Sequence, residues 1–315
     1  MKDTILYVVV PCYNEKEVLG ETSFRLKEKL VSLIDAGKIS SQSRILFVND
    51  GSKDNTWDMI KELHKDDVVF SGISLSRNRG QQNALLAGLM TAKDCADAVI
   101  SMDADLQDDI NAIDAMLEKY EEGFDIVYGV RSSRKTDTFF KKNTALAFYR
   151  MMNFLGTETV YNHAEYRLMT KRALEGLSEF KEVNLFLRGM VPMVGYKSTT
   201  VEYERAERFA GESKYPLKKM LALSVDGITS LSIKPIKFIT TLGFVIALVS
   251  LVALIYTLVK YMMGQTVIGW SSIVISVWFL GGLQLLSIGV IGEYIGKIYK
   301  ETKHRPRYII SESLL

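Results

Sequence analysis

Short apolar runs alternate with longer segments of mixed polarity over the first 130 residues of the chain. The runs are rich in β-branched residues, as buried strands are, whereas apolar residues in the intervening segments recur every three or four positions, as in helices. The pattern predicts strands at 4–10, 44–48, 68–75, 98–102 and 125–130, and helices at 17–33, 56–64, 84–92 and 110–122. Strands that alternate with helices indicate an α/β domain with a mainly parallel sheet covered on both faces.

Each of the first four predicted strands is followed by a polar loop. These loops are residues 11–15, 49–52, 77–81 and 103–109. The carboxyl ends of parallel strands share one edge of an open sheet, where ligands bind, so the four loops should meet there. The sequence has neither G-x-G-x-x-G after the first strand nor G-x-x-x-x-G-K-[ST], so it supports neither a dinucleotide fold nor a P-loop.

The fourth loop carries four carboxylates and an amide within seven residues. Asp103 and Asp105 are two positions apart, so in an extended segment both side chains would point the same way. Oxygen ligands that share an ion with water and substrate phosphates suit Mg²⁺ or Mn²⁺. Taken alone, the motif fits either a metal–diphosphate site or a solvated acidic turn.

The composition restricts the partners and the cellular compartment that we expect for the protein. The 315 residues include 39 Lys and Arg against 37 Asp and Glu, so the net charge of +2 gives no reason to expect nucleic acid as a partner. The two cysteines, Cys12 and Cys95, form neither a C-x-x-C pair nor a disulfide framework, which fits a reducing cytosolic setting. No signal peptide is expected, because the first apolar run is short and ends at Pro11.

The last quarter of the chain is far more apolar than the rest. Residues 238–259 and 270–292 are uncharged and long enough to cross a bilayer as helices of ~1.5 Å per residue, which predicts a transmembrane hairpin over 238–296. Residues 215–237 are expected to lie at the membrane face as an amphipathic segment, the alternative being a core helix of the soluble domain.

Positive charges flank this hairpin on its outer sides. Lys234 and Lys237 precede the first run and five cations follow the second, whereas the connection between the runs has only Lys260. The positive-inside rule therefore places residues 1–214, the basic tail 297–315 and both termini in the cytoplasm of an integral membrane protein with two spans.

Four segments resemble a known family. They are Pro11-Cys12-Tyr13-Asn14-Glu15, Val48-Asn49-Asp50-Gly51-Ser52, Asp103-Ala104-Asp105-Leu106-Gln107 and Arg208-Phe209-Ala210-Gly211-Glu212-Ser213-Lys214-Tyr215. They are similar to family 2 glycosyltransferases of GT-A fold, and more narrowly to polyprenyl-phosphate glycosyltransferases, which include dolichol-phosphate mannose synthase and the bacterial bactoprenol glucosyltransferases. The resemblance covers nearly the whole chain and implies a GT-A catalytic domain over residues 1–214.

The resemblance implies a donor site on the strand-end loops. The nucleotide-binding residues that it assigns are Pro11, Tyr13, Glu15, Asp50, Gly80, Gln81 and Asp103. Asp103, Asp105 and Gln107 would hold Mg²⁺ or Mn²⁺ against the donor diphosphate, where the metal stabilises charge on the departing nucleoside diphosphate. Asp109 begins a helix and is expected to cap it, while the role of Asp108 stays open.

Cations beyond the predicted sheet are candidates for the acceptor phosphate, since arginine can bind a phosphate through two hydrogen bonds. The acceptor-side residues are Arg131, Arg134, Lys142, Arg167, Arg205, Arg208, Ser213 and Lys214. Related bactoprenol enzymes typically read Gly-Asp-Phe-Arg-Leu where this chain has Ala164-Glu165-Tyr166-Arg167-Leu168, so Glu165 replaces an aspartate. The expected catalytic residues are Asp103, Asp105 and Glu165. Of these, Glu165 would orient the acceptor. A base is not required, because a phosphate monoester already carries ~1.5–2 negative charges.

These features predict a membrane-bound inverting transferase that moves a hexose from a nucleotide sugar to polyprenyl phosphate, such as undecaprenyl phosphate. UDP-glucose is the first choice of donor, with UDP-GlcNAc, UDP-galactose and GDP-mannose open. The alternatives are a processive polysaccharide synthase, which usually has more spans and a Q-x-x-R-W motif, and a non-catalytic scaffold or flippase subunit. The product would supply a downstream flippase and an extracytoplasmic glycosyltransferase in cell-envelope glycosylation. Glycines of the spans could support a homo-oligomer.

Overall fold

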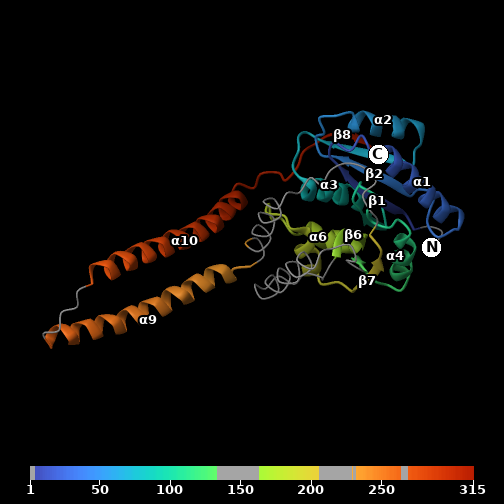
Figure 1. Cartoon of the computed structure of the whole chain (residues 1–315). Helices are drawn as coiled ribbons and strands as arrows, with labels where there is room; N and C mark the ends of the chain where they lie inside the picture. The colour runs from blue at the N-terminus through green and yellow to red at the C-terminus, as the bar shows by residue number, and fades with distance from the viewer. Residues whose placement is uncertain (1–3, 133–162, 206–228, 230–231, 264–268) are drawn as a thin grey trace.

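The computed structural model describes residues 4–132, 163–205, 229, 232–263 and 269–315. Its two parts are an α/β domain and a long helical hairpin that projects away from the sheet, and the C-terminus lies on the α/β domain (Figure 1).

One sheet contains the eight strands of the described residues, in the order β7-β5-β6-β4-β1-β2-β3-β8. They are β1 (Leu6–Cys12), β2 (Arg44–Asn49), β3 (Phe70–Leu75), β4 (Ala98–Ser101), β5 (Ile126–Arg131), β6 (His163–Thr170), β7 (Ser198–Tyr203) and β8 (Ile310–Leu314). β4, β1, β2 and β3 are parallel neighbours, as are β5 and β7, whereas β6 is antiparallel to β4 and β5, and β8 is antiparallel to β3. The prediction of a mixed, mainly parallel α/β sheet is therefore confirmed.

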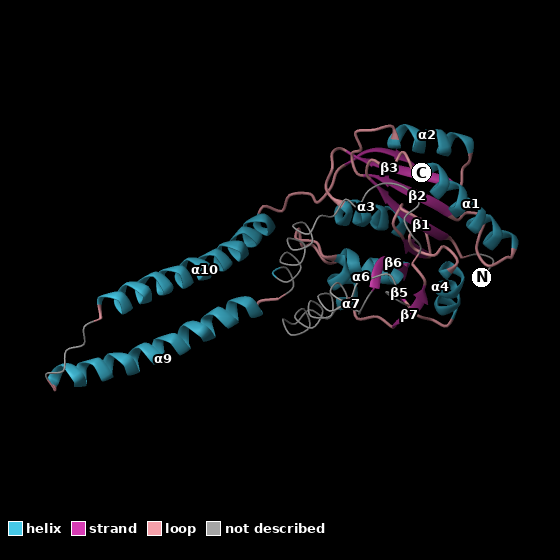
Figure 2. Ribbon diagram, in the orientation of Figure 1, coloured by secondary structure: helices cyan, strands magenta, loops and turns pink. Residues whose placement is uncertain are grey.

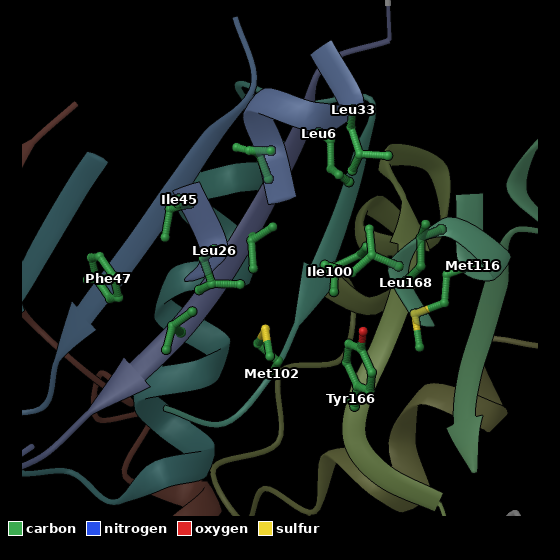
Figure 3. Close-up of a cluster of buried hydrophobic side chains, with 14 of the residues drawn as sticks. Leu6, Leu26, Leu33, Ile45, Phe47, Ile100, Met102, Met116, Tyr166 and Leu168 are labelled. Carbon is green, nitrogen blue, oxygen red and sulfur yellow. The ribbon is translucent and has the colours of Figure 1, made fainter. Parts of the chain in front are cut away.

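Helices cover both faces of this sheet (Figure 2). Those of the α/β domain are α1 (Leu19–Asp35), α2 (Thr56–Asp66), α3 (Gln81–Lys93), α4 (Ala112–Glu121), α6 (Lys171–Ser178) and α7 (Leu187–Met193). Leu26 of α1 and Met116 of α4 belong to one buried apolar layer, which Figure 3 shows around Ile100 of β4. Leu89 of α3 and Leu174 of α6 belong to the layer on the other face.

The first strand extends beyond its predicted end. The apolar pattern predicts that this strand stops at Pro11, but β1 continues to Cys12, which pairs with Asn49 of β2. The Asp50 N–H then donates to the Cys12 carbonyl oxygen at 2.9 Å. The first two polar loops therefore leave the sheet side by side.

The hairpin consists of α9 (Lys234–Met262) and α10 (Trp270–Thr302). At ~1.5 Å per residue, each is longer than the ~30 Å hydrocarbon core of a bilayer. Each contains a window that is long and apolar enough to cross a membrane, and large apolar side chains such as Val252 and Leu285 are exposed along the hairpin. The two helices are consistent with membrane spans.

The end of the chain returns to the α/β domain. The charge pattern predicts only a basic tail for residues 297–315, but α10 continues to Thr302 and β8 pairs with the outer edge of β3. The Glu301 carboxylate accepts hydrogen bonds from the backbone N–H groups of Val183 and Asn184 at 2.8 and 2.9 Å. The last membrane-type helix is thus bound to the domain that carries the strand-end loops.

Candidate active site

Hydrogen bonds join the first two strand-end loops. The Asn14 N–H donates to Ser52 Oγ at 3.0 Å, and Asn14 Oδ1 accepts from the Lys53 N–H at 2.8 Å. Three predicted nucleotide-binding residues lie half-buried on or beside these joined loops, namely Pro11, Tyr13 and Glu15.

Gly51 brings the second loop against the third. Its φ of 63° lies in the left-handed region that glycine adopts without steric cost. A Cβ at this position would lie 2.6 Å from the backbone carbonyl carbon of Arg77 and 2.6 Å from the backbone nitrogen of Asn78. The close approach of the two loops therefore requires a residue without a side chain.

Asp50 holds the third loop in place. Its buried carboxylate accepts hydrogen bonds from the backbone N–H of Arg79 at 2.7 Å and of Gly80 at 2.9 Å. Burial raises the pKa of Asp50, and the two backbone donors act in the opposite direction. The contact of Asp50 with the nucleotide stays a prediction. In the structure, Asp50 positions Gly80 at the start of α3.

The first turn of α3 contacts two carboxylates from neighbouring strands. Gln81 Nε2 donates to Asp103 Oδ1 at 2.6 Å, and Gln82 Nε2 donates to Glu165 Oε1 at 2.9 Å. Asp103 follows β4, and Glu165 lies on β6, the antiparallel neighbour of β4. The structure thus brings together Asp103 and Glu165, which are far apart in the sequence.

The acidic loop is a turn rather than an extended segment. β4 ends at Ser101, Leu106 has a φ of 55°, and Asp105 Oδ1 accepts from the Gln107 N–H at 3.2 Å. The buried Leu106 side chain anchors this sparsely populated backbone conformation. The expectation that Asp103 and Asp105 project from an extended segment is therefore wrong.

Burial and two neighbouring carboxylates raise the pKa of Asp103. The pKa of Asp103 is raised to about 6, first by burial and then by the negative charges of Asp108 and Asp105, against the positive charges of Arg188 and Arg131. Crowded carboxylates of this kind are stabilised by a cation.

The donor set suits a divalent ion that shares its coordination shell with substrate. No group of three or more His, Cys, Asp or Glu side chains within the described ranges could hold a metal ion by itself. Asp103 and Asp105 offer carboxylates, and Gln107 offers an amide oxygen that accepts a hydrogen bond from Arg205. Mg²⁺ is commonly bound by one or two carboxylates together with water and substrate phosphates. These residues therefore fit a metal that arrives with a diphosphate.

Asp108 belongs to a buried polar cluster that the sequence analysis missed. Asp108 Oδ1 accepts from the Tyr203 hydroxyl at 2.5 Å, and Arg131 hydrogen-bonds to the same tyrosine. Burial raises the pKa of Asp108, while Tyr203 and Arg131 act in the opposite direction. The alternation of apolar residues in β7 is the only sequence signal for Tyr203. Its position opposite Arg131 depends on the pairing of β7 with β5, which the sequence does not reveal.

Asp109 lies at the approach to α4. Its Oδ1 accepts a hydrogen bond from the Asn111 N–H at 2.9 Å, and its carbonyl oxygen accepts from the Tyr166 hydroxyl at 3.0 Å. These contacts give Asp109 a structural part in the loop.

Glu165 is buried between two arginines. Its side chain is 3% exposed, Oε2 accepts from Arg167 Nη2, and Oε1 accepts from Arg188 Nε at 2.9 Å. The Arg167 side chain is fully buried, and burial lowers its pKa to about 10. A direct contact of Arg167 with a lipid phosphate is therefore not supported by its placement. No sequence motif singled out Arg188.

A cavity of about 630 Å³ borders the acidic loop. Its walls include Arg25 and Lys29 of α1, Leu106 and Asp108 of the loop, and Arg205. Arg205 and Arg131 are the predicted acceptor residues that lie beside the acidic loop, and each exerts an electrostatic effect on Asp108. The remaining predicted acceptor residues, Arg134, Lys142, Arg208, Ser213 and Lys214, lie outside the described residues.

Sequence comparison decides the family of the chain. The family model described as Glycosyl transferase family 2 matches residues 7–178, which include all four strand-end loops. The chain belongs to glycosyl transferase family 2. The predicted family is therefore confirmed.

This family 2 glycosyltransferase has relatives that match it along nearly its full length. It is 56% identical over 310 residues to the uncharacterized glycosyltransferase YkoT of Bacillus subtilis (strain 168), across 98% of this chain and 92% of that relative. It is 40% identical over 305 residues to the bactoprenol glucosyl transferase of Shigella phage SfV, across 96% of this chain and 97% of that relative. Among solved structures, it is similar to the mannosyltransferase PcManGT from Pyrobaculum calidifontis in complex with GDP-Man and Mn²⁺, with a TM-score of 0.47 and 17% identity over 71% of this chain and 61% of that chain.

Proposed function

We propose that this glycosyltransferase moves one hexose from a nucleotide sugar to a polyprenyl phosphate at the cytoplasmic face of a membrane. The proposal depends chiefly on one observation: an acidic loop suited to a metal–diphosphate lies beside Arg131 and Arg205, on a domain that continues into two apolar helices. The name of the 40% identical relative, a bactoprenol glucosyl transferase, supports a polyprenyl acceptor such as undecaprenyl phosphate.

The donor in this proposal is UDP-glucose, bound across the joined strand-end loops. Pro11, Tyr13, Glu15, Gly80 and Gln81 form the nucleotide side of the site. Asp103, Asp105 and Gln107 would hold Mg²⁺ or Mn²⁺ against the diphosphate. A divalent ion, when bound there, supplies stabilisation of the negative charge on the departing nucleoside diphosphate.

The acceptor phosphate is the nucleophile. Arg131 and Arg205 neutralise part of its charge and bring it to C1 of the sugar, so no side chain has to remove a proton. A single direct displacement inverts the anomeric centre, and an α-linked donor gives a β-linked lipid product. Glu165 acts from within the protein, where its carboxylate fixes the position of arginine side chains.

The proposed orientation follows from the charges around the hairpin. Lys234 and Lys237 precede the first apolar run, and cations also follow the second, which favours the cytoplasm for both flanks and for the α/β domain.

Membranes that contain the full chain, incubated with a panel of radiolabelled nucleotide sugars, test this function. Label in an organic-extractable lipid that mild acid hydrolyses supports the proposal, and the donor that gives it identifies the sugar. Label in high-molecular-weight polymer would indicate a processive synthase, and no incorporation from any donor would contradict the proposed activity.

A further inference from the structure

Arg188 is a half-exposed cation at the edge of the site, and the function proposed above assigns it no contact with substrate. It is the second residue of α7, and its side chain is 39% exposed although it contacts a carboxylate that is 3% exposed. The Nε atom of Arg188 is therefore fixed by a buried carboxylate, while part of the side chain stays accessible to a ligand.

A hydrogen-bond network holds Arg188 through its Nε atom. Arg188 Nε donates to Glu165 Oε1 at 2.9 Å, and the same oxygen accepts from Gln82 Nε2 at 2.9 Å. Gln82 Oε1 accepts in turn from the backbone N–H of Leu187, the residue before Arg188, at 2.9 Å. Both the side chain and the backbone of this part of α7 are thus fastened to α3 and β6.

The charge of this cluster is not balanced internally. Glu165 carries one negative charge and contacts two guanidinium groups, Arg167 and Arg188, so the group has an excess of one positive charge. Arg167 is fully buried, which leaves the excess charge at the exposed end of Arg188. Gln82 donates to the same Glu165 oxygen as Arg188, and the preceding residue, Gln81, donates to Asp103. The network that holds Arg188 therefore reaches the proposed diphosphate site.

The remaining donors of Arg188 match a phosphate. A guanidinium has five N–H donors in one plane, and Nε uses one of them for Glu165. The two terminal nitrogens can then present parallel N–H groups to two phosphate oxygens, an arrangement that lysine cannot reproduce.

We propose that Arg188, oriented by Glu165, is a phosphate-binding residue of this active site. The phosphate is either the diphosphate of the nucleotide donor or the phosphate of the lipid acceptor, and in the acceptor case the proposal rests on the function proposed above.

Binding measurements on the full chain in detergent separate these two sources. Arg188→Ala and Arg188→Lys are compared with wild type and with Arg172→Ala, which removes an exposed arginine from α6. Calorimetry with Mn²⁺ present gives the affinities for UDP and GDP and for uridine and guanosine. The same proteins are then assayed for the KM of undecaprenyl phosphate.

If Arg188 binds the donor diphosphate, Arg188→Ala weakens nucleoside diphosphate binding by about 10- to 100-fold, the range for a hydrogen bond to a charged group, and leaves nucleoside binding unchanged. If Arg188 binds the lipid phosphate, diphosphate binding is unchanged and the KM of undecaprenyl phosphate rises by a similar factor. In either case Arg188→Lys recovers only part of the loss and Arg172→Ala behaves as wild type.

Equal losses of nucleoside and nucleoside diphosphate affinity would indicate a structural role and overturn the proposal. It would also be overturned if both affinities and the acceptor KM stayed within about twofold of wild type. The nucleotide measurements contain no lipid, so a selective loss of diphosphate binding would uphold Arg188 even if no transfer to polyprenyl phosphate were detected.

Discussion

Gln81 Nε2 donates a hydrogen bond to Asp103 Oδ1 at 2.6 Å. The bond joins the first turn of α3 to the end of β4. It uses one oxygen of Asp103, a proposed metal ligand, and leaves the other oxygen available to the ion. Groups that orient metal ligands in this way commonly matter for metal affinity almost as much as the ligands themselves.

Replacing Gln81 by alanine should weaken Mn²⁺ binding by roughly 10- to 100-fold, because Asp103 loses the group that orients it. The measurement is a Mn²⁺ titration of the full chain with UDP present. Gln42→Ala, which changes an exposed glutamine before β2, is the matched control and should bind as wild type. Wild-type affinity in the Gln81 variant would mean that Asp103 is not a ligand or needs no orientation.

Replacing Glu165 by glutamine should destabilise the protein by about 3–5 kcal/mol, because a fully buried Arg167 loses its charged partner. Thermal unfolding of the full chain in detergent should show a clearly lower midpoint. Glu175→Gln, an exposed glutamate on α6, should leave the midpoint unchanged. Equal midpoints for the two variants would contradict the assignment of Glu165 to a buried structural network.

Gly51→Ala should disrupt the contact between the second and third loops. The substitution adds the cost of a left-handed alanine, about 1–2 kcal/mol, to a Cβ clash with the backbone of Arg77 and Asn78. We expect weaker nucleotide binding in a chain that still folds, measured by UDP calorimetry and circular dichroism. Gly20→Ala is the control, because a Cβ there meets nothing within 4 Å, and it should bind UDP as wild type does.

Glu301→Gln should loosen the contact between α10 and the α/β domain. Hydrogen bonds to a charged acceptor contribute roughly 1.5–3 kcal/mol each, so the backbone amides of Val183 and Asn184 should exchange at least tenfold faster. Hydrogen exchange with mass spectrometry measures this directly. Glu179→Gln, an exposed glutamate in the same region, should not change the exchange, and unchanged protection in Glu301→Gln would show that the contact is not stabilising.

The sequence predicted those parts of the molecule that depend on local pattern. The period of apolar residues located the first five strands and the helices between them, and the polar residues after each strand located the loops that meet at one edge. The Asp-x-Asp motif and the apolar hairpin were also readable, because each is encoded within a few dozen consecutive residues.

Contacts between distant segments could not be read from local pattern. Asp50 and Arg167 have the residue types of ligand contacts, yet each is buried against a protein partner, and burial depends on the tertiary fold. β8 pairs with a strand more than 200 residues earlier, and the short apolar run Tyr308-Ile309-Ile310 was its only local signal. Arg188 became a candidate only once α7 was placed beside Glu165.

The most direct test of the proposed function uses the purified full chain in nanodiscs that contain undecaprenyl phosphate, incubated with UDP-[¹⁴C]glucose and Mn²⁺. We predict one labelled sugar per lipid, in an organic-extractable product that mild acid hydrolyses, with the label lost on adding EDTA. We also predict loss of the label in Asp105→Asn, a variant that should retain the wild-type circular dichroism spectrum. Label that enters polymer, or lipid labelling that persists in EDTA and in Asp105→Asn, would contradict a metal-dependent transfer of a single hexose to a lipid phosphate.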